Sequence, residues 1–121
     1  MTKEAALTEF FESFVIPAYE ESNVPSDASY PRITYNVAIG DGMHETALAC
    51  SVWYYSEAWI DCNAKVEEIR RRISAGGIIL PCDGGAIWLK RGDPFAQNVA
   101  DENEMVRRKY LNLVAQYIVT D

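Results

Sequence analysis

The chain has 121 residues, of which 49% are hydrophobic and 24% charged, and it carries a net charge of −7. A chain of this length and composition forms one folded domain, residues 1–121, with a substantial hydrophobic core. No apolar run approaches the ~18 residues that a membrane span needs, and the acidic N-terminus does not resemble a secretory signal.

The negative charge is concentrated in the first half of the chain. Residues 1–57 carry nine acidic and two basic side chains, whereas residues 58–121 carry nine of each. An acidic protein of this kind does not grip nucleic acid phosphates over a broad face. Its charge suits DNA that slides past without sticking, a basic partner, or simple solubility.

The N-terminal half predicts a helix followed by a pair of strands. Apolar residues at helical spacing predict an amphipathic helix from about residue 3 to 15, which Pro17 ends. Residues 18–31 contain two prolines and predict a polar loop. Residues 32–39 alternate in hydrophobicity and residues 46–55 are rich in β-branched and aromatic side chains, so we expect two strands paired as a hairpin.

The next segment predicts a helix with one apolar side. Residues of this stripe recur every three or four positions: Trp59, Cys62, Val66, Ile69 and Ile73. We expect Ser56 to cap the N-terminus of the helix, and Gly76 and Gly77 to end it. The stripe predicts that this helix packs on a sheet.

The last third of the chain predicts strands. Residues 78–80 and 86–90 flank an Asp-Gly-Gly turn and predict a hairpin, which Gly92-Asp93-Pro94 closes. Residues 97–104 predict a mobile loop. Residues 105–119 fit either a strand or a helix, and we favour a long strand because β-branched and aromatic residues crowd its end. Together the elements predict an α+β fold with two layers, in which two helices pack on one mainly antiparallel sheet.

No catalytic signature accompanies these elements. Cys82 is the candidate thiol nucleophile and His44 the candidate base, but nothing in the sequence brings the two together. The cysteines lack a Cys-x-x-Cys pair and the chain has one histidine, so we expect reduced thiols and no zinc site. No phosphate-binding glycine motif occurs. We therefore expect no catalytic residues, no metal and no cofactor, and a small thiol enzyme is the least favoured hypothesis.

Aromatic residues indicate contact surfaces instead. The consecutive rings of Trp53, Tyr54 and Tyr55 must lie on both faces of one strand. One face belongs to the core, and the other is covered by a helix, covered by a partner, or exposed. Protein interfaces favour aromatic residues and arginine, so a partner is one of the explanations for this excess of rings.

Three segments carry a resemblance to known proteins. They are SVWYYSEAWIDCNAKVEEI (51–69), GGIILPCDGGAIWLKRGDPFAQ (76–97) and VRRKYLNLVAQYI (106–118). In this order they resemble the tail terminator family of long-tailed bacteriophages and prophages, the tail-completion or minor tail protein U type. The resemblance extends over about residues 4–119 and consists of packing and turn patterns. Head–tail joining proteins of similar size are the nearest alternative.

The resemblance implies a structural virion protein without enzyme activity or cofactor. It implies a ring, usually of six subunits, that caps the tail tube, stops its polymerisation and presents a surface to the head. The implied partners are further copies, the tail tube protein and a head-completion or connector protein, while DNA passes through without specific binding. The implied location is the tail or neck of the virion, and the host cytoplasm during assembly. A non-catalytic bacterial protein-binding module is the other alternative.

We expect subunit or tail contacts at aromatic and charged residues. They are Trp53, Tyr55, Arg70, Arg72, Lys90, Arg91, Asp93, Arg107 and Arg108.

Overall fold

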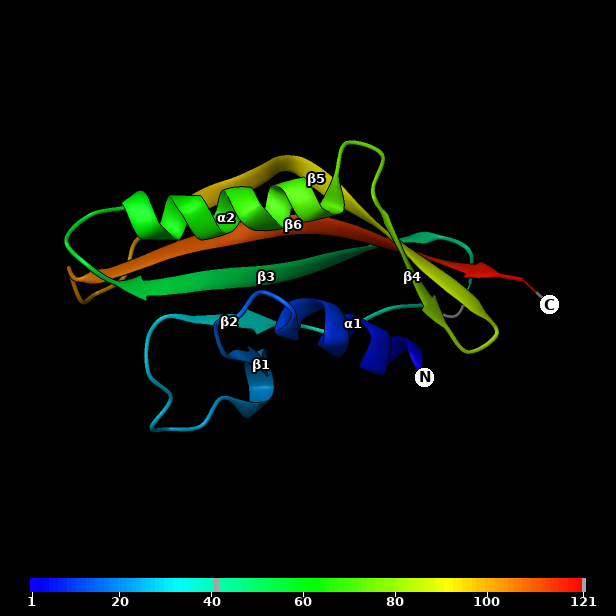
Figure 1. Ribbon diagram of the computed structural model, residues 1–121, viewed down its shortest axis with the longest axis horizontal. Coiled ribbons are helices and arrows are strands. Elements are labelled where there is room, and N and C mark those ends of the chain that lie inside the picture. The colour runs from blue at the N-terminus through cyan, green and yellow to red at the C-terminus, as the bar shows by residue number, and fades with distance from the viewer. Residues whose placement is uncertain (41, 121) are drawn as a thin grey trace.

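The computed structural model describes residues 1–40 and 42–120, which form two α-helices and one six-stranded sheet (Figure 1). The elements in chain order are α1 (Lys3–Glu12), β1 (Ala18–Glu20), the 3-10 helix η1 (Glu21–Asn23), β2 (Arg32–Tyr35), β3 (Glu45–Tyr55), α2 (Ile60–Ile73), β4 (Ile78–Cys82), β5 (Gly85–Val99) and β6 (Val106–Val119). The strand order is β1-β2-β3-β6-β5-β4, and every pair is antiparallel except β1 with β2. The expected α+β fold is confirmed.

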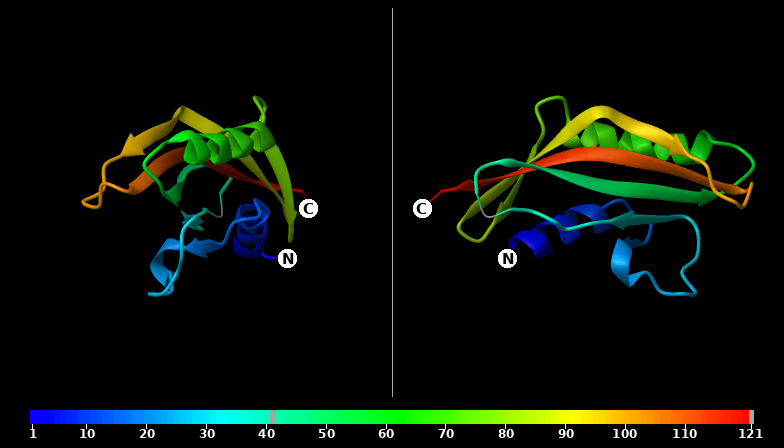
Figure 2. Two further views of the ribbon diagram at one scale, coloured as in Figure 1. Left: turned by 60° about the vertical axis from the view of Figure 1, so that its left-hand side comes forward. Right: turned by 180° about the vertical axis from the view of Figure 1, so that it is seen from behind.

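The sheet curls, and both helices lie on the same face of it (Figure 2). The apolar stripe of α2 is confirmed, because Cys62, Val66, Ile69 and Ile73 are all buried. They meet buried side chains from the long central strands: Leu48, Cys50, Val52, Ile87, Leu89, Leu111, Leu113 and Ala115. Each strand contributes alternate residues to this core, as the two-residue period of a strand requires.

Helix α1 extends the core toward β2. Its Phe11 is fully buried and stacks on Tyr35 of β2 with ring centroids 4.7 Å apart. Thr2 caps the helix by accepting a hydrogen bond from the backbone N–H of Ala5. The helix ends at Glu12, three residues before the expected end, and the backbone then takes a left-handed turn at Val15, where φ is 76°.

The hairpin of β2 and β3 is confirmed, but two predictions around it are wrong. Residues 18–31 are not only loop, since β1 pairs in parallel with β2. A three-residue edge strand is too short to show a period in the sequence. Strand β2 ends at Tyr35 and not at residue 39, although Val37 and Ile39 still pack on the core as half-buried side chains.

Around α2 and β4, the structure differs from expectation at three places. Helix α2 ends at Ile73 with Ser74 as its C-cap, where φ is 54°, so Gly76 and Gly77 do not end it. Ser56 does not cap α2, because the cap position is Trp59 and the Ser56 hydroxyl accepts from the Ala58 N–H instead. Strand β4 runs through Pro81, which is compatible with an edge strand because the missing N–H is not needed for pairing. The hairpin of β4 and β5 around Asp83-Gly84 is confirmed.

The largest local error concerns β5. Gly92-Asp93-Pro94 does not close the hairpin but lies inside this strand, where the pairing with β6 shifts between Arg91 and Ala96. A bulge and a turn use the same residue types, so the sequence pattern does not separate them. The expected loop at 97–104 therefore begins only after Val99. Strand β6 confirms the preference for a strand over residues 105–119.

Candidate assembly surface

One face of the sheet carries no helix. Odd-numbered residues of β3 and the even-numbered residues of β6 that pair with them point away from α1 and α2. Figure 2 shows this side in its right-hand view, with the strands in front and both helices behind. We call it the open face.

Three residues form a row across neighbouring strands of the open face. Arg32 of β2 pairs with Trp53 of β3, which pairs with Arg108 of β6. The guanidinium carbons of Arg32 and Arg108 lie 5.5 Å and 4.4 Å from the Trp53 ring centroid, and Arg32 also lies 4.3 Å from the Tyr30 ring. These are cation–π distances. We call Arg32, Trp53 and Arg108 the Arg–Trp ladder.

Hydroxyl groups of the next row hold the ladder in place. The Trp53 indole donates to Thr34 Oγ1 at 2.9 Å, and Arg108 Nε donates to Ser51 Oγ at 3.1 Å. Both hydroxyl residues are buried, so the two bonds are shielded from water. The ladder is therefore a preorganised surface.

Neither arginine of the ladder forms an ion pair with another residue in the described ranges. Arg32 donates to the Ala28 carbonyl at 3.1 Å, while its Nε is buried without a partner in the described part of the chain. Two positive charges thus flank one indole, and no carboxylate of residues 1–40 and 42–120 pairs with either of them.

At the other end of the open face, the positive charge of Lys90 is paired with a carboxylate of the same chain. Lys90 lies 3.3 Å from a carboxylate oxygen of Glu45 and 4.2 Å from the Trp88 ring centroid. Between this end and the ladder lies a shallow hollow of about 310 Å³, lined in part by Ala47, Ala49 and Gly92. The same hollow is lined by larger side chains, including Tyr110 and Asn112, and aromatic and cationic groups lie on both sides of it.

The structure brings five of the expected contact residues onto the open face: Trp53, Tyr55, Lys90, Arg108 and Asp93, the last at the hollow. Tyr55 is 53% exposed and contacts the Tyr30 ring, with centroids 5.8 Å apart. Tyr54 points the other way and packs against the core.

The remaining expected residues lie elsewhere. Arg91 is on the helix side, where its Nε donates to the Arg70 carbonyl at 3.0 Å, and the side chain of Arg70 pairs with Glu67. Arg72 joins the helices, since it donates to Ser13 Oγ at 3.0 Å.

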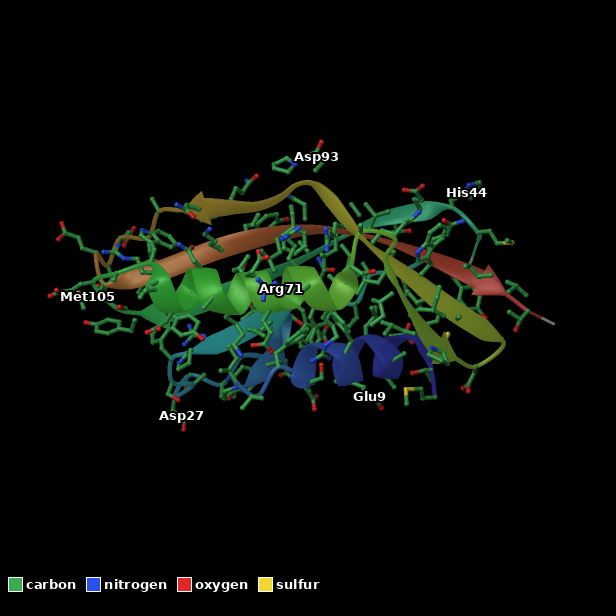
Figure 3. The ribbon with its side chains drawn as sticks, turned by 45° about the horizontal axis from the view of Figure 1, so that its top comes forward. Glu9, Asp27, His44, Arg71, Asp93 and Met105 are labelled. Carbon is green, nitrogen blue, oxygen red and sulfur yellow. The ribbon has the colours of Figure 1, made fainter. Side chains whose placement is uncertain are left out.

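Arg107 and Asp93 are also away from the ladder. The guanidinium of Arg107 lies 5.6 Å from the Trp59 ring and donates to the Glu57 carbonyl, on the helix side. Asp93 is exposed at the bulge of β5, at the border of the molecule (Figure 3), where it lines the hollow of the open face but not the ladder. The nine residues thus do not form one surface.

Sequence reasoning missed the part of the ladder contributed by β2. Arg32 and Thr34 occupy the polar side of the alternation in residues 32–39, next to Tyr30 in the preceding loop. The polar side of this alternation indicates that Arg32 and Thr34 share one face of the strand. It does not predict which residue of β3 lies opposite Arg32.

The thiols show no activation. Burial is the main cause that raises the pKa of Cys82, and the Asp83 carboxylate adds to it, so this thiol stays protonated at neutral pH. Burial raises the pKa of Cys62 to about 11 and raises that of Cys50 as well. His44, the candidate base, is exposed near one end of the molecule (Figure 3). Within residues 1–40 and 42–120, no group of three metal-binding side chains occurs.

Neither helix of the described chain has the length and apolarity to cross a bilayer.

No protein-family model matches the chain, and no curated protein matches it. Among solved structures, one chain of the "Virion of native gene transfer agent (GTA) particle" matches with a TM-score of 0.72 at 15% sequence identity. The two chains share a fold. The likeness covers 94% of this chain and 92% of the other, so it extends over nearly the full length of both.

Proposed function

We propose that this chain is a structural virion protein that acts as a tail terminator. In this role, copies of the chain form a closed ring, with six subunits as the expected number, at the head-proximal end of the tail tube. The ring stops tail polymerisation and joins the tail to a head-completion or connector protein. The chain acts in the host cytoplasm during assembly and stays in the neck of the virion, without enzyme activity or cofactor.

The observation that carries this proposal is the shared fold with a chain of the gene transfer agent virion, over nearly the full length of both chains. It agrees with the resemblance of residues 4–119 to tail terminators. Both the sequence pattern and the backbone therefore favour a structural virion protein, and the finer role of tail terminator rests on the resemblance.

The open face supplies what such an assembly needs. A ring of identical subunits uses two different surfaces of each subunit, which meet in a heterologous contact. Aromatic residues and arginine are the usual anchors of protein contacts, and both lie on the open face with fixed geometry.

The net charge of −7 suits passage of DNA through the ring. Negative charge repels phosphates, so DNA slides through an acidic channel without a specific complex. A reconstruction of the ring with lysine and arginine side chains lining the channel would contradict this part of the proposal.

The function is tested with tail-tube subunits from the same genome. Tubes polymerised in vitro are expected to stop growing when the chain is added, and electron microscopy should show one ring at one end of each tube. Tubes that grow unchanged, with no ring in any condition, would contradict the proposal. A ring that binds the head connector but leaves tube length unchanged would indicate a head–tail joining protein instead.

A further inference from the structure

We propose that the Arg–Trp ladder of one copy binds acidic side chains on the α1–η1 border of the next copy. This inference rests on the proposed ring and names the two surfaces that build it.

The ladder has the chemistry of a carboxylate receptor. Arg32 and Arg108 each lie against an aromatic ring, and their guanidinium groups lack a carboxylate partner in the described chain. A planar guanidinium that stacks by its face still offers N–H groups along its edge, which match the two oxygens of a carboxylate. The packing that fixes Trp53 lowers the entropy cost of ordering these side chains on binding.

The same chain provides the acidic partner surface. Besides Glu4 in the first turn of α1, four glutamates are exposed from the second half of α1 to η1: Glu9, Glu12, Glu20 and Glu21. None of them forms an ion pair with another residue of the described ranges. Figure 3 shows Glu9 on α1 at the outer border of the molecule. We call these four residues the acidic border.

The placement of the two surfaces favours contact between copies. Helix α1 lies on the helix-covered side of the sheet, whereas the ladder lies on the open face (Figure 2). The sheet therefore separates the ladder from Glu9 and Glu12 of its own chain, and neither Glu20 nor Glu21 forms an ion pair with Arg32. Two complementary surfaces at different places on one subunit give a heterologous contact, which forms a ring when the rotation closes.

A protein partner fits these charges better than nucleic acid does. The ladder offers two cations in one row, while strong binding of duplex DNA requires neutralisation of several phosphates by a broad basic surface. The net charge of −7 opposes such a surface. Binding of DNA by the ladder is the alternative that the experiment distinguishes from binding between copies.

The test reverses the charges of the ladder and then of its partner. The double variant Arg32→Glu/Arg108→Glu should associate about tenfold or more weakly than the unmodified chain, as seen in sedimentation velocity over a concentration series, because like charges then meet. Replacing all four glutamates of the acidic border with lysine should weaken association in the same way. Both sets of changes in one chain should restore the ring.

The control places one such charge reversal elsewhere and is compared with the single variant Arg108→Glu. Arg71→Glu alters an arginine whose side chain is 78% exposed and which pairs with Glu67 on α2, so association should stay unchanged. Circular dichroism shows whether each variant is folded. The neutral variant Arg32→Gln/Arg108→Gln serves where the double reversal does not fold, and it should give a smaller loss in the same direction.

Four outcomes would overturn the inference. A ring that forms equally well with the ladder reversed would remove the ladder from the interface and leave the proposed function standing. Loss of the ring in Arg71→Glu to the same extent would show a general charge effect. A reversed ladder that only lowers binding of a labelled DNA duplex would assign the ladder to nucleic acid. If the unmodified chain forms no ring, alone or on tail tubes, the proposed function falls and the inference falls with it.

Discussion

The two faces of the sheet use the same strands for different purposes. On the helix-covered face, Leu48, Cys50 and Val52 of β3 are almost fully buried. On the open face, Trp53 and Tyr55 of the same strand retain contact with solvent. The comparison teaches that alternate residues of one strand stabilise the fold on one side and offer contact groups on the other.

The two faces also differ in how they treat charge. The core under the helices is built from apolar side chains, and Ser51 and Thr34 are the buried polar residues of the described chain. Those two hydroxyls accept hydrogen bonds from open-face residues. The two buried hydroxyl groups thus hold the side chains of Trp53 and Arg108 in place on the open face.

The largest expected effect is on stability, and it distinguishes the two faces directly. Phe11→Ala should lower the free energy of unfolding by about 3–5 kcal/mol, because Phe11 is fully buried and its removal leaves a cavity. Tyr55→Ala, on the open face, should cost about 1 kcal/mol or less, since Tyr55 is 53% exposed. Urea denaturation measures both. Equal losses would mean that the open face is part of the core.

A smaller effect is expected at Gly77, which lies between α2 and β4 and against Trp88 of the open face. Gly77→Ala should destabilise by about 1–3 kcal/mol, because φ at Gly77 is 87° and an added Cβ would lie 2.5 Å from Trp88 Nε1. The neighbouring Gly76 has nothing within 4 Å of such a Cβ, so Gly76→Ala should be neutral or slightly stabilising. Thermal denaturation of the pair checks this, and an equal shift in both variants would contradict it.

The helix-covered face should also make stability depend on alkaline pH. Burial raises the pKa of Cys62 from 9.0 to about 11, so the unfolded chain loses this proton at a lower pH than the folded chain. The contribution of the protonated Cys62 thiol to the free energy of unfolding is complete below pH 9.0 and is lost as pH rises toward about 11. Urea denaturation at several pH values should show this decline, and Cys62→Ala should reduce it. A stability that rises between these pH values would contradict the sign.

The smallest effect concerns reactivity without a change in stability. Cys50 and Cys62 are buried under the helices, whereas Cys82 is half-buried on the edge strand β4. A thiol reagent at neutral pH should therefore label Cys82 slowly and leave the other two unlabelled until urea is added. Mass spectrometry identifies the labelled residue. Rapid labelling of Cys82 would indicate an activated thiol and reopen the enzyme hypothesis.

The sequence predicted the elements whose periodicity covers many residues. The stripe from Cys62 to Ile73 correctly predicted that α2 packs on the sheet. The composition of residues 105–119 correctly favoured a strand. Long amphipathic or β-rich segments repeat their signal, so one ambiguous residue does not change the outcome.

Short and irregular features were missed for physical reasons. Strand β1 is fixed by its parallel pairing with β2, which leaves no local pattern. The bulge at Gly92-Asp93-Pro94 uses turn residues inside a strand. The ladder depends on the register between β2, β3 and β6, and register is set by contacts distant in sequence.

Electron cryomicroscopy of tail tubes assembled with the chain tests the central claim most directly, because it shows what covers the open face. The account predicts a closed ring at one end of each tube, with the open face of every copy in contact with a neighbouring subunit. Tubes without a ring, or a ring in which Trp53 and Arg108 contact no other subunit, would contradict it.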